Sequence, residues 1–538
     1  MTTKKTLKLP SDIRENLCPN SKPTMKMKRT DQFLLLLLCV QIAYFIYSLY
    51  IRNVDIDDAW LGEHAYWMAK DGYAKSELMR GWFLQEERIL IHHKLMTLQG
   101  MVFIKIFGFS VYTLKSVSLM YFVLFLVLFY YYTVVFKKLL SKQQIIIAFL
   151  LLFTFHYSFK FSFIFRPEIL LMFLAFINFI ALERAIEIKK KQYLFIILAG
   201  IISGLCIVAH LNGISIALSG GLILILRKKW KSFFIYGAAV ILGSSLYFYD
   251  FTGEYGFAYW KYQLFNSTLG QNSGSSDILV YLIYNLAKEH MRFFHDMTII
   301  PFTLVLILII FAGYKIFVKQ YRLMADYTLF LILFIAFLFS QKSRQYILIY
   351  LPYLLIALSV GIDKLIRNEK GLTEWIYRKP IRYFTGILLI VFMVISEIYN
   401  IKVSSGKYDP GVYRSISEIY IGENTKTKNI VAPLDFIFDE ITHFNHIQSE
   451  RLYTTMQIRD SSIYGSGFLN KTKDFNIDYV LLTPSCRKQL GMESLKVNDT
   501  LAGFKLIYRS GKYCMLKKIE QIHVGKSLLS GKSTKNKL

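Results

Sequence analysis

The sequence predicts a polytopic α-helical membrane protein with about 11 transmembrane helices and a small C-terminal α/β domain. Of its 538 residues, 54% are hydrophobic and 16% are aromatic, and the mean hydropathy is +0.38. Long apolar runs recur along the chain, which is not typical of soluble proteins. Lys and Arg outnumber Asp and Glu by 64 to 37, and the surplus lies mainly in short loops between the runs. Such loops orient a chain in a bilayer, so we expect membrane lipids, and no nucleic acid, as partners.

The chain begins with a polar, basic segment at residues 1–32. It contains eight Lys or Arg residues against three acidic ones. The apolar run 33–51 that follows is long enough to span a bilayer and lacks a small-residue cleavage site. We therefore expect a membrane anchor preceded by a cytoplasmic N-terminal tail.

Ten further spans are predicted from apolar runs, and the run 95–109 is set apart from them. That run is short and is interrupted by Lys105, so an amphipathic helix at the membrane interface is expected there. The ten spans are 111–136, 145–159, 169–186, 193–209, 213–226, 233–251, 298–318, 327–339, 346–362 and 384–399.

The alternation of loops predicts which parts of the chain lie outside. With a cytoplasmic N-terminus, the five markedly basic connections all fall on the cytoplasmic side, as the positive-inside rule requires. The transmembrane domain 33–399 then has its first outer loop at 52–110 and another at 252–296. Residues 400–538 form an extracytoplasmic domain, and the protein is expected to be multi-pass in the plasma (inner) membrane.

The C-terminal segment has the pattern of a small α/β domain. We expect a strand from Asn429, a helix over 435–444, a buried strand at 478–483 and a hairpin over 504–518. No site motif lies in this domain. The five cysteines are too few and too scattered for a disulfide framework, and only Cys486 and Cys514 lie where they could meet.

An acidic cluster, Asp55-Ile-Asp-Asp-Ala-Trp-Leu-Gly-Glu-His64, follows the first span. Carboxylates directly outside a membrane are costly to keep without a purpose, which suggests a functional site. The same Asp-x-Asp-Asp spacing is also suited to capping the N-terminus of a helix.

Basic residues gather on the same predicted outer face. Lys160, Arg166 and Glu168 lie between the third and fourth spans, and His210 lies between the fifth and sixth. Lys342 and Arg344 lie in an outer loop, where the positive-inside rule disfavours them, and an anionic partner would explain them. Snorkelling of long basic side chains gives the same pattern, and a lone loop His is often a satisfied structural residue.

A carboxylate close to cations fits glycosyl transfer from a lipid phosphate. The carboxylate takes the proton of the acceptor hydroxyl, and a cation or a metal stabilises the departing phosphate. A polyprenyl tail on the donor would explain why such an enzyme lies in a membrane.

The order of the outer-loop motifs resembles the GT-C class of membrane glycosyltransferases. The likeness is to the branch with the aminoarabinose transferase that acts on lipid A and the protein O-mannosyltransferases, and it covers about residues 30–365. The motifs are Asp57-Asp58-Ala59-Trp60 with Gly72-Tyr73, Ile106-Phe-Gly-Phe-Ser110, Arg166-Pro-Glu168, His210-Leu-Asn-Gly213 and Arg344-Gln-Tyr346 with Leu351-Pro352.

The resemblance implies an inverting transfer from a polyprenyl-phosphate-linked sugar to a lipid, glycan or protein acceptor. It gives Asp57 the role of catalytic base and Asp58 that of its acidic partner. The assigned donor-phosphate-binding residues are Lys160, Arg166, Lys342 and Arg344, and the assigned substrate-binding residues are Glu168, His210, His93 and Lys94.

Two positions depart from the family pattern. Ile91-His92-His93-Lys94 replaces the usual Lys-Pro-Pro, and Lys115 replaces an Arg, which keeps the charge without the bidentate fork. A divalent metal held by His92 and His93 beside Asp57 is an alternative, although adjacent histidines seldom both reach one ion.

The competing class is a transporter or lipid flippase without transferase chemistry. Such proteins tend to show internal repeats and polar groups in the middle of the membrane. This sequence shows no repeat, and its ionisable groups gather at one face. A structural or sensor protein that acts through its outer domain is a more distant alternative.

Overall fold

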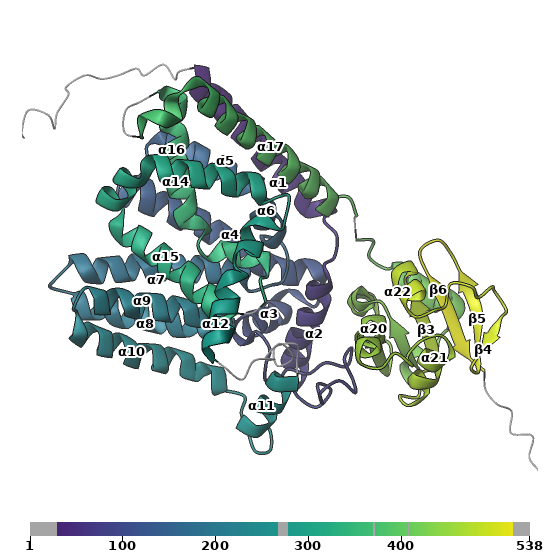
Figure 1. Cartoon of the computed structure of the whole chain (residues 1–538). Helices are drawn as coiled ribbons and strands as arrows, with labels where there is room; N and C mark the ends of the chain where they lie inside the picture. The colour runs from purple at the N-terminus through teal and green to yellow at the C-terminus, as the bar shows by residue number, and fades with distance from the viewer. Residues whose placement is uncertain (1–28, 267–277, 340, 369–371, 407, 520–538) are drawn as a thin grey trace, which may run out of the picture.

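The computed structural model describes residues 29–266, 278–339, 341–368, 372–406 and 408–519. Most of the predicted N-terminal tail therefore lies outside the described residues. A large helical part is followed by a smaller domain that contains the sheet (Figure 1).

Each of the predicted apolar ranges lies largely on a helix. Seven helices in the described part of the chain are long and apolar enough to cross a membrane. The predicted number of eleven is not confirmed, because the four others have only 13 to 17 residues. The helices are α1 (Arg29–Ile51), α4 (Val111–Tyr130, continued by a π-helix to Phe136), α5 (Lys142–Thr154), α7 (Glu168–Glu187), α8 (Gln192–Ala209), α9 (Ile214–Leu226), α10 (Trp230–Ser245), α14 (Ile300–Gln320), α15 (Arg322–Leu338), α16 (Leu351–Arg367) and α17 (Lys379–Val403).

Two predicted ranges differ from the helices that the structure describes. Within the described residues α1 already includes Arg29, four residues before the predicted apolar run, and Asp31 in its first turn pairs with Arg367 at 2.8 Å. The range 145–159 is divided at Phe155 into α5 and the short helix α6 (His156–Phe161).

Glycines allow α8 and α10 to lie close together, and α7 packs on the other side of α8 (Figure 1). A Cβ atom added at Gly204 would lie 2.5 Å from the backbone nitrogen of Ser244 in α10. Small residues at such contacts let helix backbones approach in the way that membrane helices commonly pack.

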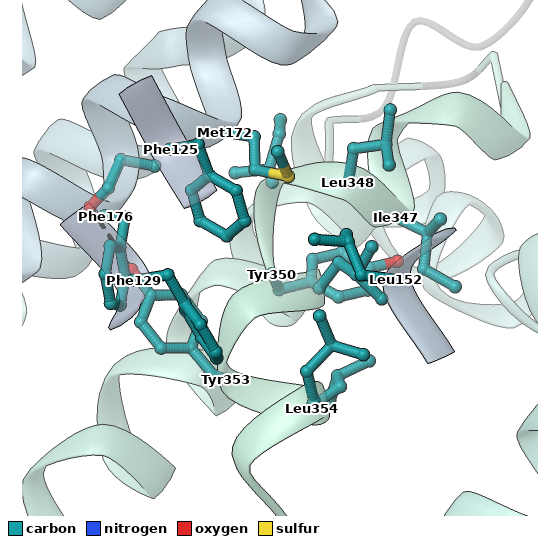
Figure 2. Packing of buried hydrophobic residues seen from close by; sticks show 14 of the residues in the cluster. Phe125, Phe129, Leu152, Met172, Phe176, Ile347, Leu348, Tyr350, Tyr353 and Leu354 are labelled. Carbon is teal, nitrogen blue, oxygen red and sulfur yellow. Dashed lines mark hydrogen bonds between the residues drawn. The ribbon is translucent and has the colours of Figure 1, made fainter. Parts of the chain in front are cut away.

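The centre of the helical part is a core rich in aromatic side chains. Figure 2 shows side chains from α4, α5, α7 and α16 meeting those of the 3₁₀ helix η6 (Arg344–Ile349). The rings of Phe176 and Tyr353, for example, lie 6.0 Å apart between centroids. This core fixes η6, and with it one of the outer segments that carry predicted site residues.

The loop 52–110 contains the helices α2 (Ile56–Asp71) and α3 (Lys94–Phe107). The predicted amphipathic segment is thus helical, and it leaves Ile106 and Phe107 exposed. The loop 252–296 forms the short helices α11 (Phe257–Asn266), α12 (Ile278–Ala287) and α13 (His290–Phe294).

The C-terminal domain has a six-stranded sheet in the order β2-β1-β3-β6-β5-β4. The strands β1 and β2 pair in parallel, as do β1 and β3, and β6 is antiparallel to both β3 and β5. The strands are β1 (Asn429–Ala432), β2 (His446–Ser449), β3 (Tyr479–Leu482), β4 (Thr500–Leu501), β5 (Phe504–Arg509) and β6 (Cys514–Lys518).

The predicted strands and the hairpin of this domain are confirmed. The helix predicted over 435–444 is wrong in length, because only Ile437–Glu440 is α-helical after a 3₁₀ turn. Four short helices, α18 (Val412–Tyr420), α20 (Glu450–Arg459), α21 (Ser466–Lys473) and α22 (Pro484–Gln489), complete the described domain. Cys486 and Cys514 are both buried free thiols.

Residues 76–82 of the loop 52–110 join the C-terminal domain to the helical part. The backbone N–H of Ser449 donates to the carbonyl of Leu78 at 2.9 Å, so the loop covers the open edge of β2. Glu77 pairs with Nδ1 of His446 at 2.9 Å. The loop 52–110, which begins with the acidic cluster, therefore contacts the C-terminal domain as well as the helical part.

Candidate active site

Five segments that are distant in the sequence meet around Arg166. Its Nη1 pairs with Asp57 at the start of α2, and its Nε and Nη2 donate to Glu168 at 2.7 to 3.1 Å. Nε2 of His210 lies 3.0 Å from the hydroxyl of Tyr346 in η6. The ring of His93 stacks on that of His210, with 4.7 Å between centroids. We call these six residues, which the sequence analysis predicted on the outer face, the outer-face cluster.

The sequence around Asp57 explains its position. Asp55 is the N-cap of α2, its carboxylate accepts from the backbone N–H of Asp57 at 3.2 Å, and it forms a capping box with Asp58. The capping role that the spacing suggested is therefore confirmed for Asp55. This cap sets the start of α2, so Asp57 lies in the first turn of the helix.

Asp58 occupies the position of an anchor. Its carboxylate is fully buried and accepts from the backbone N–H groups of Asp55 at 2.8 Å and Phe165 at 2.7 Å. Lys115 of α4 pairs with it at 3.2 Å. Burial raises the pKa of Asp58 to about 6 against the opposing effect of Lys115. Both oxygens are engaged, so its contacts join α2, α4 and the turn before α7.

Asp57 differs from Asp58 in being accessible. Its side chain is 20% exposed, whereas that of Glu168 is fully buried. Burial and the neighbouring Asp55 and Glu168 raise the pKa of Asp57, while Arg166 opposes the shift. Because Arg166 is shared with Glu168, it neutralises Asp57 only in part. An accessible carboxylate of raised basicity is suited to general base catalysis.

The hydrogen bonds of His210 indicate its tautomer. Its Nδ1 accepts from the backbone N–H of Asn212 at 3.0 Å, so the neutral ring carries its proton on Nε2. Burial lowers the pKa of His210 to about 4, which keeps the ring neutral at pH 7. Nε2–H then donates to Tyr346, and the tyrosine keeps its own O–H for another acceptor.

The other predicted phosphate-binding cations pair with different carboxylates. Lys160 pairs with Asp55 at 3.0 Å and remains 30% exposed. Lys342 is buried and pairs with Glu289 at 3.1 Å. Arg344 pairs with Asp296 at 2.8 Å and remains 36% exposed. The structure thus gives Lys342 and Arg344 partners outside the outer-face cluster.

Lys94 and His92 meet at Asp250 and not at Asp57. Lys94 is fully buried, pairs with Asp250 and lies 4.7 Å from the ring centroid of Tyr247. His92 contacts Asp250 through Nε2 at 3.2 Å. The sequence predicts a span over 233–251 that includes Asp250. That prediction is wrong at its end, because α10 ends at Ser245. These contacts connect α3 to the end of α10 and leave Lys94 closed to solvent.

The residues do not fit a metal site at His92 and His93. His92 faces Asp250 while His93 stacks on His210, so the two rings have different neighbours. Among the described residues, no group of three or more His, Cys, Asp or Glu side chains is arranged to hold a metal ion.

Sequence reasoning missed the carboxylates that neutralise the predicted cations. Glu289 and Asp296 lie in the loop 252–296, which had been placed on the outer face without further assignment. The sequence contained a signal for these carboxylates, because cations in a predicted outer loop beside an apolar run need counter-charges.

Comparison with solved structures shows the same fold in membrane enzymes. ArnT from Cupriavidus metallidurans bound to undecaprenyl phosphate superposes with a TM-score of 0.53 at 10% identity, over 91% of this chain and 98% of that one. The oligosaccharyltransferase AglB from Archaeoglobus fulgidus, in complex with an inhibitory peptide and a dolichol-phosphate, gives 0.51 at 12% identity, over 85% and 70%. No protein-family model matches the sequence, and no curated protein matches it.

The anchoring role of Asp58 can be tested by removing its charge alone and then together with that of Lys115. Asp58→Asn leaves Lys115 buried without its counter-charge, which typically costs about 3–5 kcal/mol. We expect a lower thermal unfolding temperature in detergent, partly restored in Asp58→Asn with Lys115→Met. The control is Asp71→Asn, at an accessible ion pair of the same helix. Equal effects of Asp58→Asn and Asp71→Asn would contradict the assignment.

The fold is therefore similar to that of ArnT and AglB, and the likeness to GT-C glycosyltransferases is confirmed at the level of the fold.

Proposed function

We propose that this protein is a membrane glycosyltransferase that moves a sugar from a polyprenyl-phosphate donor to an acceptor hydroxyl at the outer face. The observation that supports it best is the accessible carboxylate of Asp57, with raised pKa, at the meeting point of five outer segments. Of the similar structures, ArnT is bound to undecaprenyl phosphate and AglB is in complex with a dolichol-phosphate, which supports a lipid-linked donor.

In the proposed reaction Asp57 takes the proton of the acceptor hydroxyl. The acceptor oxygen then forms a bond to the anomeric carbon while the bond from that carbon to the phosphate oxygen breaks on the opposite face. The electron pair leaves with the lipid phosphate, and the configuration inverts. Protonation of Asp57 removes one of the two negative charges that pair with Arg166. Glu168 remains as the other.

The positions of the cations suggest how the donor phosphate is held. Lys160 and Arg344 retain accessible side chains beside their carboxylate partners, so an incoming phosphate can reach them. Arg166 and Lys342 are more enclosed and help mainly by setting the local charge. His93, His210 and Glu168 line the same cluster and are proposed to contact the sugar or position its neighbours.

The proposed topology has eleven spans, a cytoplasmic N-terminus and an extracytoplasmic C-terminal domain. The supporting pattern is the concentration of basic residues in the five connections that this arrangement places inside. It also puts the outer-face cluster and residues 408–519 on the same side of the membrane.

Asp57→Asn should reduce transfer by at least about 100-fold, since loss of a general base typically costs that much. The measurement is release of lipid phosphate from a labelled polyprenyl-phosphate sugar by the purified protein. Asp71→Asn, at the other end of α2, should leave the rate unchanged. Full turnover by Asp57→Asn would contradict the assignment. A transporter would leave the sugar-phosphate bond intact, in the unmodified protein as well as in the variant.

The pH dependence of transfer should report the environment of Asp57. The base must be ionised, so activity falls as the pH falls through the pKa of Asp57, which lies above its ordinary value. Glu168→Gln removes a neighbouring negative charge and frees Arg166 for Asp57, so the acidic limb should move to lower pH. Glu87→Gln, at an exposed position in the loop 52–110 that contains Asp57, should not move the acidic limb. An unmoved limb in Glu168→Gln would argue against Asp57 as the titrating base.

The orientation can be tested by labelling introduced cysteines after the native ones are replaced by serine. Asn470→Cys in the C-terminal domain should react with an impermeant maleimide in intact cells. Lys190→Cys, in a connection proposed to be cytoplasmic, should react only after permeabilisation. The reverse pattern would overturn the topology.

A further inference from the structure

A cationic pocket lies beside the outer-face cluster, where α1, α6 and α17 end. Its volume is about 350 Å³. Its lining includes Arg52 and Asn53 after α1, His156 and Lys160 on α6, and Tyr399 and Lys402 on α17. The ends of α1 and α17 are joined there by a hydrogen bond from the backbone N–H of Asn53 to the carbonyl of Val403 at 3.2 Å.

Arg52 is a buried cation held without a carboxylate among the described residues. It is 3% exposed, and it donates to the carbonyl of Phe159 at 2.5 Å and to Oγ of Ser48 at 3.0 to 3.1 Å. Its guanidinium also lies 4.1 Å from the ring centroid of Phe159. Burying a charge is costly unless it is paired. The structure therefore maintains an uncompensated positive charge at the pocket wall.

The other lining charges increase this surplus. Lys160 is paired with Asp55, which is the carboxylate of the pocket lining. The side chain of Lys402 makes no hydrogen bond or ion pair within the described part of the chain. Three cations and one carboxylate thus line the pocket and leave two positive charges uncompensated. His156, which hydrogen-bonds to Asn400 at 3.1 Å, adds no negative charge.

The surroundings of the pocket are those of a lipid headgroup site. Exposed apolar side chains lie near it on the two helices, including Tyr50 of α1 with Ile398 and Ile401 of α17. These helices are among those long and apolar enough to cross a membrane, and both end at the pocket. A lipid in this pocket would meet cations at the ends of α1 and α17 and apolar side chains along these helices. Basic pockets between membrane helices are known as binding sites for the head groups of anionic lipids.

We propose that this pocket binds the phosphate group of a membrane lipid through Arg52, Lys160 and Lys402. The lipid's role as a substrate of transfer rests on the proposed function, whereas its binding does not require turnover. A phosphate bound to Lys160 would compete with Asp55 for that lysine. Because Asp55 caps α2 and accepts from the backbone N–H of Asp57, occupancy of the pocket is connected to the position of Asp57.

Binding can be measured on the full-length purified protein by thermal shift in detergent. The ligand is dioctanoyl phosphatidic acid, compared with dioctanoyl phosphatidylcholine and with inorganic phosphate. Phosphatidic acid should stabilise the protein at lower concentration than either. Lys402→Gln, at an exposed helix end, should weaken this binding at least about tenfold, or about 1.4 kcal/mol, because it removes a charged donor to the phosphate.

Matched variants separate the pocket from its neighbours. The Lys105→Gln variant, which changes an exposed cation on α3 outside this pocket, should bind as the unmodified protein does. Asp57→Asn should also keep binding, so failure of transfer and failure of the pocket can be distinguished. Equal affinity for phosphatidylcholine, or no effect of Lys402→Gln, would overturn the proposal. Equally tight binding of inorganic phosphate would overturn the lipid as the source of the phosphate.

Discussion

The arrangement of the proposed outer face depends on the buried contact between Asp58 and Lys115. One carboxylate receives a lysine from α4 and two backbone N–H groups, from the start of α2 and from the turn before α7. Removing a charge from water is costly, so these partners are required and cannot be exchanged singly. The contact fixes where α2 begins, and therefore where Asp57 lies relative to Arg166. The lysine at 115 suits this task because it delivers a compact charge at the end of a flexible stem.

Most charged groups at the outer face are already compensated, and this changes the interpretation of its cations. The sequence suggested a group of free cations that await a phosphate. The structure gives each of them a carboxylate, from Asp55 for Lys160 to Glu289 for Lys342. A phosphate that arrives must therefore compete with a carboxylate or find a cation that lacks one. Arg52 and Lys402 are such cations, and neither was singled out from the sequence.

Much of the fold could be predicted because apolar length and loop charge act locally. The ranges of the helices, the strand β3 and the β5–β6 hairpin follow from runs of apolar residues. The strand β2, His446–Ser449, carries no such run and was missed, since its burial depends on the loop segment that covers it. Loop alternation placed the segments of His210, Tyr346 and His93 on one face, but it predicted neither their contacts nor the pairing of Lys94 with Asp250. Such pairings are set by packing between distant helices, which local pattern does not encode.

The basicity of Asp57 follows from how Arg166 is shared. A carboxylate with a guanidinium of its own would be held as a weak base, because the pair stabilises the ionised form. Here Glu168 takes the fork of Arg166 with its fully buried carboxylate, and Asp57 receives only Nη1. Burial and the nearby negative charges then raise the pKa of Asp57. After protonation of Asp57, Arg166 is still paired, so the proton can be accepted without leaving a buried cation alone. The short Arg166-Pro-Glu168 segment achieves this by placing both charges on one side of a single turn.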